Sequence, residues 1–267
     1  MRTYHQLTDR DGSGLAEQIG AQRRRVAERL AGVSRIVAVM SGKGGVGKSY
    51  VTANLGRALA RSGKAVGVLD ADLNGPTIPA LLGDADARRT THENPAPAVG
   101  LDGVTYTSMG QFLEGGAPLA FTGPATESFV WRGAMEASVV RELLGDVEWG
   151  KLDVLLLDLP PGMQRYVELC DLLGTPPAVL TVTIPTPESR DAVRRAMRSA
   201  ADRGSALLGI VENMVGGELK GSAADELAAE FAVPVLARIP WHPSSSEWDR
   251  LGRQISDARH TTHDARP

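Results

Sequence analysis

Short runs of aliphatic residues alternate along the chain with longer segments in which apolar residues recur every three or four positions. The short runs are typical of strands buried on both faces of a sheet, and the longer periodic segments are typical of helices packed on such a sheet. The predicted strands are 36–40, 64–69, 154–158, 178–184, 206–212 and 234–239, with weaker ones at 103–109 and 119–122. The predicted helices are 15–31, 51–60, 134–144, 164–174, 187–203, 223–231 and 245–254.

This alternation of strands with helices predicts an α/β fold. The expected architecture is a doubly wound, mostly parallel sheet flanked by helices, with ligands at the carboxyl ends of the strands. We expect one domain over residues 33–255, preceded by a polar tail and helix at 1–32. A second polar tail is expected at 256–267.

Composition narrows the class of protein. The 267 residues suffice for one substantial core, and the net charge of −3 gives no basic bias toward nucleic acid. No apolar run is long enough to span a bilayer, and no signal peptide is recognised at the start of the sequence. The single cysteine, Cys170, excludes an internal disulfide framework. We therefore expect a cytoplasmic protein with no nucleic-acid or membrane partner.

The segment 41–49 carries the clearest chemical signal in the sequence. It reads Ser-Gly-Lys-Gly-Gly-Val-Gly-Lys-Ser and lies between the first predicted strand and the following helix. Its glycines, lysine and serine fill the G-x-x-x-x-G-K-[ST] pattern of a phosphate loop in the required strand–loop–helix setting. The sequence therefore predicts a phosphate-loop NTPase.

Each residue type in this loop has a role in phosphate binding. Glycines let the backbone N–H groups converge on phosphate oxygens without obstruction by a Cβ. Lys48 is expected to contact the β- and γ-phosphates and the Ser49 hydroxyl to ligate Mg²⁺. The predicted nucleotide-binding residues of the loop are Gly42, Lys43, Gly44, Gly45, Val46, Gly47, Lys48, Ser49 and Tyr50.

Acidic residues end two of the predicted strands. Asp158 follows an apolar run and precedes Leu-Pro-Pro-Gly, where a carboxylate can act on the Mg²⁺ side of the site; a strand-end cap is the alternative. Asp70 and Asp72 form a second acidic pair, and one of these carboxylates can orient the attacking water. The alternative for this pair is a turn with two solvated acids.

Further motifs in the same order resemble a known family. They are Asp-Ala-Asp-Leu-Asn-Gly-Pro-Thr-Ile-Pro at 70–79, Trp-Arg-Gly-Ala-Met at 131–135, Val-Glu-Trp-Gly at 147–150, Asp-Leu-Pro-Pro-Gly at 158–162 and Val-Glu-Asn-Met at 211–214. Together with the second lysine of the loop, Lys43, they resemble the Mrp/ApbC family of iron–sulfur cluster carrier ATPases. That family belongs to the MinD/ParA class with a deviant phosphate loop, and the resemblance covers roughly residues 33–255.

The resemblance implies a homodimer that encloses two ATP molecules with Mg²⁺. Lys43 would reach the partner's nucleotide and act in catalysis with Lys48, and Asp72 would match the switch I aspartate used in hydrolysis. Asp70 would join Ser49 and Asp158 on the Mg²⁺ side. Asn213 would read the adenine, since a side-chain amide offers both a donor and an acceptor; a turn-former after a strand is the alternative.

The sequence departs from the family at its cargo site. Family members that carry a cluster have a Cys-x-x-Cys shortly after Glu-Asn-Met, whereas residues 215–221 here hold no cysteine. A cluster bridging a dimer needs four thiolates, and two copies of Cys170 supply two. A slow, switch-type ATPase with an unidentified protein partner, possessing no iron–sulfur cluster, is compatible with these residues. A nucleotide-switched positioning or regulatory protein of the MinD/ParA type is the alternative.

Overall fold

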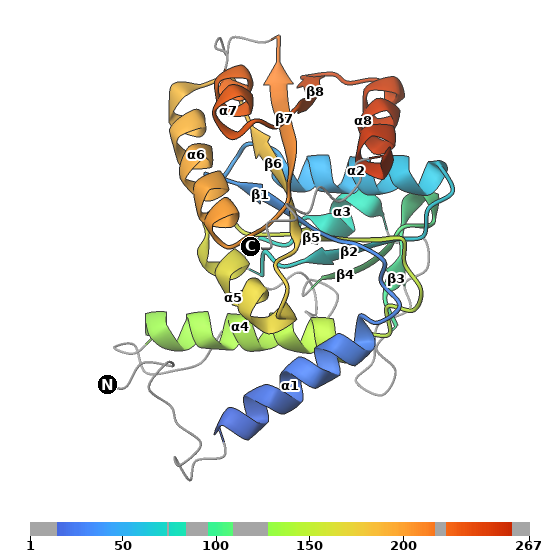
Figure 1. Cartoon of the computed structure of the whole chain (residues 1–267). Coiled ribbons are helices and arrows are strands. Elements are labelled where there is room, and N and C mark those ends of the chain that lie inside the picture. Colours follow the sequence, from blue (N-terminus) through green and yellow to red (C-terminus); the bar gives the residue numbers. More distant parts are fainter. Residues whose placement is uncertain (1–14, 74, 84–95, 109–127, 217–222, 258–267) are drawn as a thin grey trace, which may run out of the picture.

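The structure is a computed structural model of the chain, and it describes residues 15–73, 75–83, 96–108, 128–216 and 223–257 (Figure 1). The tails predicted at the two ends fall outside these residues, apart from the last helical positions before 258. The weak strand predicted at 119–122 also lies outside them.

The described strands and helices follow the predicted alternation. The strands are β1 (Ile36–Ser41), β2 (Val66–Asp70), β3 (Ala98–Val99), β4 (Thr105–Ser108), β5 (Val154–Asp158), β6 (Ala178–Thr183), β7 (Leu207–Val215) and β8 (Val235–Pro240). The helices are α1 (Leu15–Arg29), α2 (Lys48–Arg61), α3 (Ile78–Leu82), α4 (Ser128–Asp146), α5 (Gln164–Leu173), α6 (Pro187–Asp202), α7 (Ala223–Phe231) and α8 (Ser245–Asp257), with a 3₁₀ turn η2 (Leu101–Gly103).

The described strands form one sheet in the order β3-β4-β2-β5-β1-β6-β7-β8. All pairings are parallel except that of β3 with β4. The chain passes from β1 to β2 on one side of the sheet and later to β6 on the other. The carboxyl end of β1 is therefore next to the point where the winding direction reverses, which is where such folds bind ligands. The predicted doubly wound, mostly parallel α/β fold is confirmed.

Alternation along the central strands divides the core between the two faces of the sheet. Val37 and Val39 pack in a cluster with side chains of α2 and α8. Ala38 and Met40, which point to the other face, pack in a cluster with side chains of α1, α4 and α5. Since both faces are covered, the central strands are almost entirely buried and mostly aliphatic, with polar residues at their carboxyl ends.

Three local features differ from the prediction. The short helix α3 begins inside the segment expected to be a loop, and the edge strand β3 lies at the end of the expected surface excursion at 84–100. Strand β7 continues past residue 212 to Val215, because pairing with β8 resumes after an irregularity between Asn213 and Val215. Asn213 therefore lies within β7, two residues before its end.

Helix α1 docks against α4 rather than on the sheet itself. Val26 and Leu30 are buried at this contact, and a Cβ at Gly145 would lie 3.2 Å from Val26 Cγ2. Arg25 Nη1 is 3.0 Å from Asp146 Oδ1 at the same end. The two helices are close there and diverge toward the N-terminal end of α1 (Figure 1). Within the described ranges, no helix has the length and apolar character needed to cross a membrane.

Candidate functional site

The phosphate-loop sequence connects β1 to α2, and two of its glycines are required for different reasons. A Cβ at Gly42 would lie 2.3 Å from the carbonyl carbon of Ala192 in α6, so the loop passes against a helix backbone that cannot yield. Gly47 has φ of 77°, and a Cβ there would lie 2.3 Å from Asn213 Nδ2. Any side chain at either position displaces the loop.

Helix α2 begins directly after this loop with an open N-terminus. Gly47 is its N-cap residue, no side chain accepts a hydrogen bond from the first turn, and that turn holds no acidic residue. The first N–H groups of a helix lack partners within the helix and carry a partial positive charge. This terminus is therefore suited to an anion such as a phosphate.

Asp158, at the end of β5, is the centre of a buried polar cluster under the loop. Lys48 Nζ lies 2.7 Å from its Oδ1, Ser49 Oγ lies 2.5 Å from its Oδ2, and Thr52 Oγ1 lies 2.8 Å from its Oδ1. Asp158 is fully buried and Lys48 is 7% exposed. The structure thus brings Lys48, Ser49 and Asp158 together, as their predicted roles require.

Thr52 belongs to this cluster, and the motif did not identify it. It lies four residues after Lys48, one turn along α2, so its hydroxyl faces the same side. The single hydroxyl hydrogen is shared between Asp158 Oδ1 and the Lys48 carbonyl oxygen, which lies 3.0 Å away. The four-residue spacing between Lys48 and Thr52 is the sequence feature that could have predicted this contact. A hydroxyl one turn after a buried lysine is placed to satisfy a second lone pair of the carboxylate.

The donor set of this cluster fits Mg²⁺. A serine hydroxyl and a carboxylate are the hard oxygen ligands that this ion prefers, and both atoms lie next to the open N-terminus of α2. Lys48 forms an ion pair with Asp158 in the same place. Removing either partner of a buried ion pair leaves an uncompensated charge, which is strongly unfavourable.

Asp70 lies beside Asp158 because β2 and β5 are adjacent and in register at these residues. Its carboxylate accepts hydrogen bonds from the backbone of Asp72 and Ile78, each at 3.2 Å, and from Ser108 Oγ at 3.1 Å. Burial, together with the charge of Asp158, raises the pKa of Asp70 to about 7. In this arrangement Asp70 holds both ends of the loop between β2 and α3.

That loop forms one wall of a cavity of about 420 Å³ above the phosphate loop. Asp72, Thr77 and Leu81 line one side, and Pro161 lines another. The remaining lining residues are Ala80 and a run from the phosphate loop, namely Ser41, Lys43, Gly44, Gly45, Val46, Gly47, Lys48, Ser49 and Tyr50. Asp70, Asp158 and Asn213 do not line the cavity and lie beneath it, buried.

Asn213 contacts the phosphate loop from below. Its side chain is 3% exposed, and Nδ2 donates to the carbonyl oxygen of Val46 at 2.9 Å. Its position against Gly47 gives it a role in supporting the loop that sequence reasoning missed, besides the predicted contact with adenine. Tyr50 packs edge-on against Trp248 of α8, with ring centroids 5.5 Å apart.

The comparisons with known proteins agree with this geometry. A protein-family model described as "ParA: NUBPL iron-transfer P-loop NTPase" matches residues 32–266. The chain belongs to this family. The resemblance to iron–sulfur cluster carrier ATPases, inferred from the motifs, is confirmed.

Two relatives and one solved structure illustrate membership of this P-loop NTPase family. The iron–sulfur cluster carrier protein of Saccharolobus solfataricus is 33% identical, over 92% of this chain and 84% of its own length. Cytosolic Fe-S cluster assembly factor NUBP2 of Bos taurus is 35% identical, over 86% of this chain and 85% of its own. A nucleotide-binding protein from Archaeoglobus fulgidus, solved with ADP, superposes with a TM-score of 0.65 and 31% identity, covering 90% of this chain and 98% of that one.

Cys170 lies in α5 and is buried against the sheet. Burial raises the pKa of its thiol above the usual value, which favours the neutral form of the sulfur. Among the described residues no group of three or more His, Cys, Asp or Glu side chains is arranged to hold a metal ion. Most of the segment 215–221, where the resemblance led us to look for a cysteine pair, lies outside the described residues.

We predict that Gly42→Ala weakens the binding of Mg-ADP by at least about tenfold, the cost of displacing one charge-assisted hydrogen bond. The physical reason is the 2.3 Å approach of the new Cβ to Ala192. Isothermal titration calorimetry measures the change. Gly20→Ala is the control, because the nearest atom there is the flexible end of Arg24 at 3.4 Å. Wild-type affinity in Gly42→Ala would contradict this account of the loop.

A second prediction concerns the stability of the protein without nucleotide or divalent cations. The pKa of Asp70 is about 7 in the folded state and near 3.8 in the unfolded state, so the folded state holds more protons between these values. The free energy of unfolding therefore falls as pH rises through this window. Between pH 5 and pH 8 the wild type should lose on the order of 2–3 kcal/mol more than Asp70→Asn in urea unfolding. Parallel pH profiles for the two proteins would show that Asp70 titrates normally.

Proposed function

We propose that this chain is a homodimeric, Mg²⁺-dependent ATPase of iron–sulfur cluster assembly that carries no cluster of its own. The proposed binding of Mg-ATP rests on one observation, the cluster of Lys48, Ser49 and Asp158 next to the open N-terminus of α2. Membership of the iron-transfer P-loop NTPase family supports the wider role.

In the proposed site, the loop amides and the N-terminus of α2 bind the phosphates. Lys48 would turn from Asp158 toward the β- and γ-phosphates, while Ser49 and Asp158 would hold Mg²⁺. Asp70 positions the loop that carries Asp72 through two backbone hydrogen bonds. It also lies beside Asp158 in the sheet, so it would act on the Mg²⁺ site indirectly, through this loop and through Asp158. Mg²⁺ would neutralise phosphate charge that develops as the γ-phosphoryl group leaves.

Asp72 is the proposed positioning residue for the attacking water. It lines the cavity from the loop after β2, opposite the phosphate-loop residues. A carboxylate at this place accepts a hydrogen bond from water and directs it toward the γ-phosphate. Because positioning rather than strong base chemistry is supplied, we propose slow hydrolysis that acts as a switch.

The dimer proposal rests on Lys43. Its side chain lines the nucleotide cavity and is partly exposed, and within the described part of the chain its ammonium group has no hydrogen bond or ion pair. A cation without a partner at the rim of a phosphate site is available to a nucleotide bound by a second copy of the chain. Closure of two copies around ATP and reopening after hydrolysis would change the surface offered to a protein partner.

The cluster-free part of the proposal rests on cysteine count and burial. Cys170 is the sole cysteine of the chain, so a homodimer has two thiols where a bridging cluster needs four. Cys170 also packs inside the core, away from the nucleotide cavity. A role in cluster assembly would then be exercised on a partner that holds the cluster.

Replacing each of the two lysines of the loop by alanine should affect a different step, nucleotide binding for Lys48 and ATP hydrolysis for Lys43. Lys48→Ala should abolish measurable Mg-ATP binding, because its own subunit's phosphates lose their buried cation. Lys43→Ala should bind Mg-ADP within about threefold of wild type but hydrolyse ATP on the order of 100-fold more slowly, as when a cation supplied in trans is lost. Calorimetry and phosphate-release assays measure the two quantities.

Mixing the two variants provides the decisive control for this prediction. A mixed dimer contains one site with Lys48 from one subunit and Lys43 from the other, so mixing should restore hydrolysis above the sum of the separate rates. No gain on mixing, at protein concentrations where wild-type activity is maximal, would mean that Lys43 acts within its own subunit.

Anaerobic incubation with iron and sulfide tests whether the protein carries a cluster. We expect no iron–sulfur chromophore at stoichiometric levels after desalting, since the thiolates needed are absent from the sequence. A relative that has the Cys-x-x-Cys serves as the positive control in the same experiment. A stable chromophore that disappears in Cys170→Ser would overturn this part of the proposal.

A further inference from the structure

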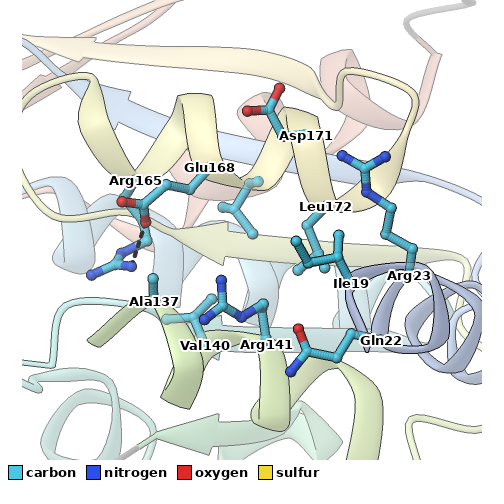
Figure 2. A pocket seen from close by; sticks show the side chains of 11 residues that line it. Ile19, Gln22, Arg23, Ala137, Val140, Arg141, Arg165, Glu168, Asp171 and Leu172 are labelled. Atoms are coloured by element: carbon cyan, nitrogen blue, oxygen red, sulfur yellow. Dashed lines mark hydrogen bonds and ion pairs between the residues drawn. The ribbon is translucent and has the colours of Figure 1, made fainter. Parts of the chain in front are cut away.

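A second cavity, of about 260 Å³, lies between α1, α4 and α5, away from the phosphate loop (Figure 2). Each helix contributes residues spaced three or four apart, which places them on the face turned toward the cavity. This cavity lies where α1 diverges from α4, beyond the close contact of the two helices at Val26 and Gly145 (Figure 1). The matched family region begins at residue 32, so one wall of this cavity comes from a helix outside it.

The body of the cavity is apolar. Ile19 of α1 and Val140 of α4 line it together with Leu169 and Leu172 of α5, and Figure 2 shows Ile19 next to Leu172. An engineered apolar cavity of about 150 Å³ accommodates benzene, so this volume suits a ligand of somewhat greater size. An aliphatic or aromatic group of about six to ten non-hydrogen atoms is the matching class.

Arg141 is a cation at the cavity whose Nε has no hydrogen-bond partner among the described residues. Arg141 reaches in from α4, and its Nε is buried without a hydrogen bond. Within the described residues its guanidinium makes no hydrogen bond or ion pair. Gln22 of α1 lines the same cavity. Leaving a buried donor unsatisfied costs free energy, which a bound acceptor would recover.

The other charges lining the cavity limit the charge of the ligand. Arg165 is already neutralised by Glu136 at 3.1 Å and Glu168 at 2.6 Å. Arg23 and Asp171 also line the cavity and are opposite in sign. The lining residues alone carry three positive and two negative charges, and Glu136 beside Arg165 balances the third positive charge, so Arg141 is distinguished by its buried donor without a partner rather than by an excess of charge. Because two carboxylates face the same space, a ligand with two or more negative charges is disfavoured.

We propose that the cavity between α1, α4 and α5 binds a small monocarboxylate with an apolar body. The carboxylate accepts hydrogen bonds from Arg141, whose planar fork matches two carboxylate oxygens, and from the amide of Gln22. The apolar body lies between Ile19 and Leu172. This site is independent of the nucleotide site in its residues and in the chemistry it recognises.

Titration of the nucleotide-free protein with hexanoate, followed by calorimetry or methyl NMR, tests the proposal. We expect saturable binding to one site, weakened about 10- to 100-fold in Arg141→Gln, as expected for the loss of a charge-assisted hydrogen bond. Hexan-1-ol and the dianion adipate should each bind at least about tenfold more weakly than hexanoate. The control Arg253→Gln, at an exposed arginine on α8 across the sheet, should bind hexanoate like the wild type.

A second variant keeps the test decisive should Arg141→Gln prove unstable by thermal melting. Ile19→Trp fills the cavity from α1 without touching its charges, and hexanoate binding should be lost while Mg-ADP binding persists. The proposal is overturned by absence of saturable hexanoate binding at 10 mM, by equal affinity in Arg141→Gln, or by equal affinity for hexan-1-ol. None of these outcomes depends on ATP hydrolysis or dimer formation, so they do not bear on the proposed ATPase.

Discussion

The contact between Asp158 and Lys48 is the interaction on which the site depends. A fully buried carboxylate at a strand end is tolerable only if a cation and hydroxyl donors satisfy it, and here Lys48, Ser49 and Thr52 do so. All three come from the first turn and a half of α2, so the cluster fixes that helix to the end of β5. The parallel register, which sets Val39 beside Asp158 and Asp70 on the other flank, brings β1 and its loop to the same place.

Around this contact, support comes from elements far apart in the sequence. Asn213 holds the Val46 carbonyl from β7, the backbone of α6 closes on Gly42, and Asp70 ties the loop that carries Asp72. Each of these contacts lies beneath or beside the cavity rather than in it. The phosphate loop is therefore supported on its buried side and open to the cavity on the other side. This arrangement holds the backbone N–H donors in place before a ligand binds.

Much of this was predictable, and the limits have physical causes. The loop at 41–49, the buried strands and Asp158 follow from local patterns, because glycine spacing and aliphatic runs report backbone geometry directly. Thr52 and Ser108 were missed since a hydroxyl becomes significant only through a distant carboxylate. The edge strand β3 is too short to show a period of alternating residues in the sequence. The cavity between α1, α4 and α5 depends on how three helices cross, which local sequence does not determine. The ion pair of Lys48 was also beyond the motif, which describes the lysine only with its phosphate.

That ion pair has a consequence for selectivity. Lys48 is already paired with Asp158, so a free anion that attracts Lys48 must leave the buried Asp158 carboxylate without its counter-charge. An anion arriving with its own divalent cation avoids this cost, because the exchange gives each buried charge a new partner. From this ion pair we expect the site to prefer an anion that arrives with a divalent cation over inorganic phosphate or metal-free nucleotide, and this preference would come from the resting protein rather than from any contact with the base.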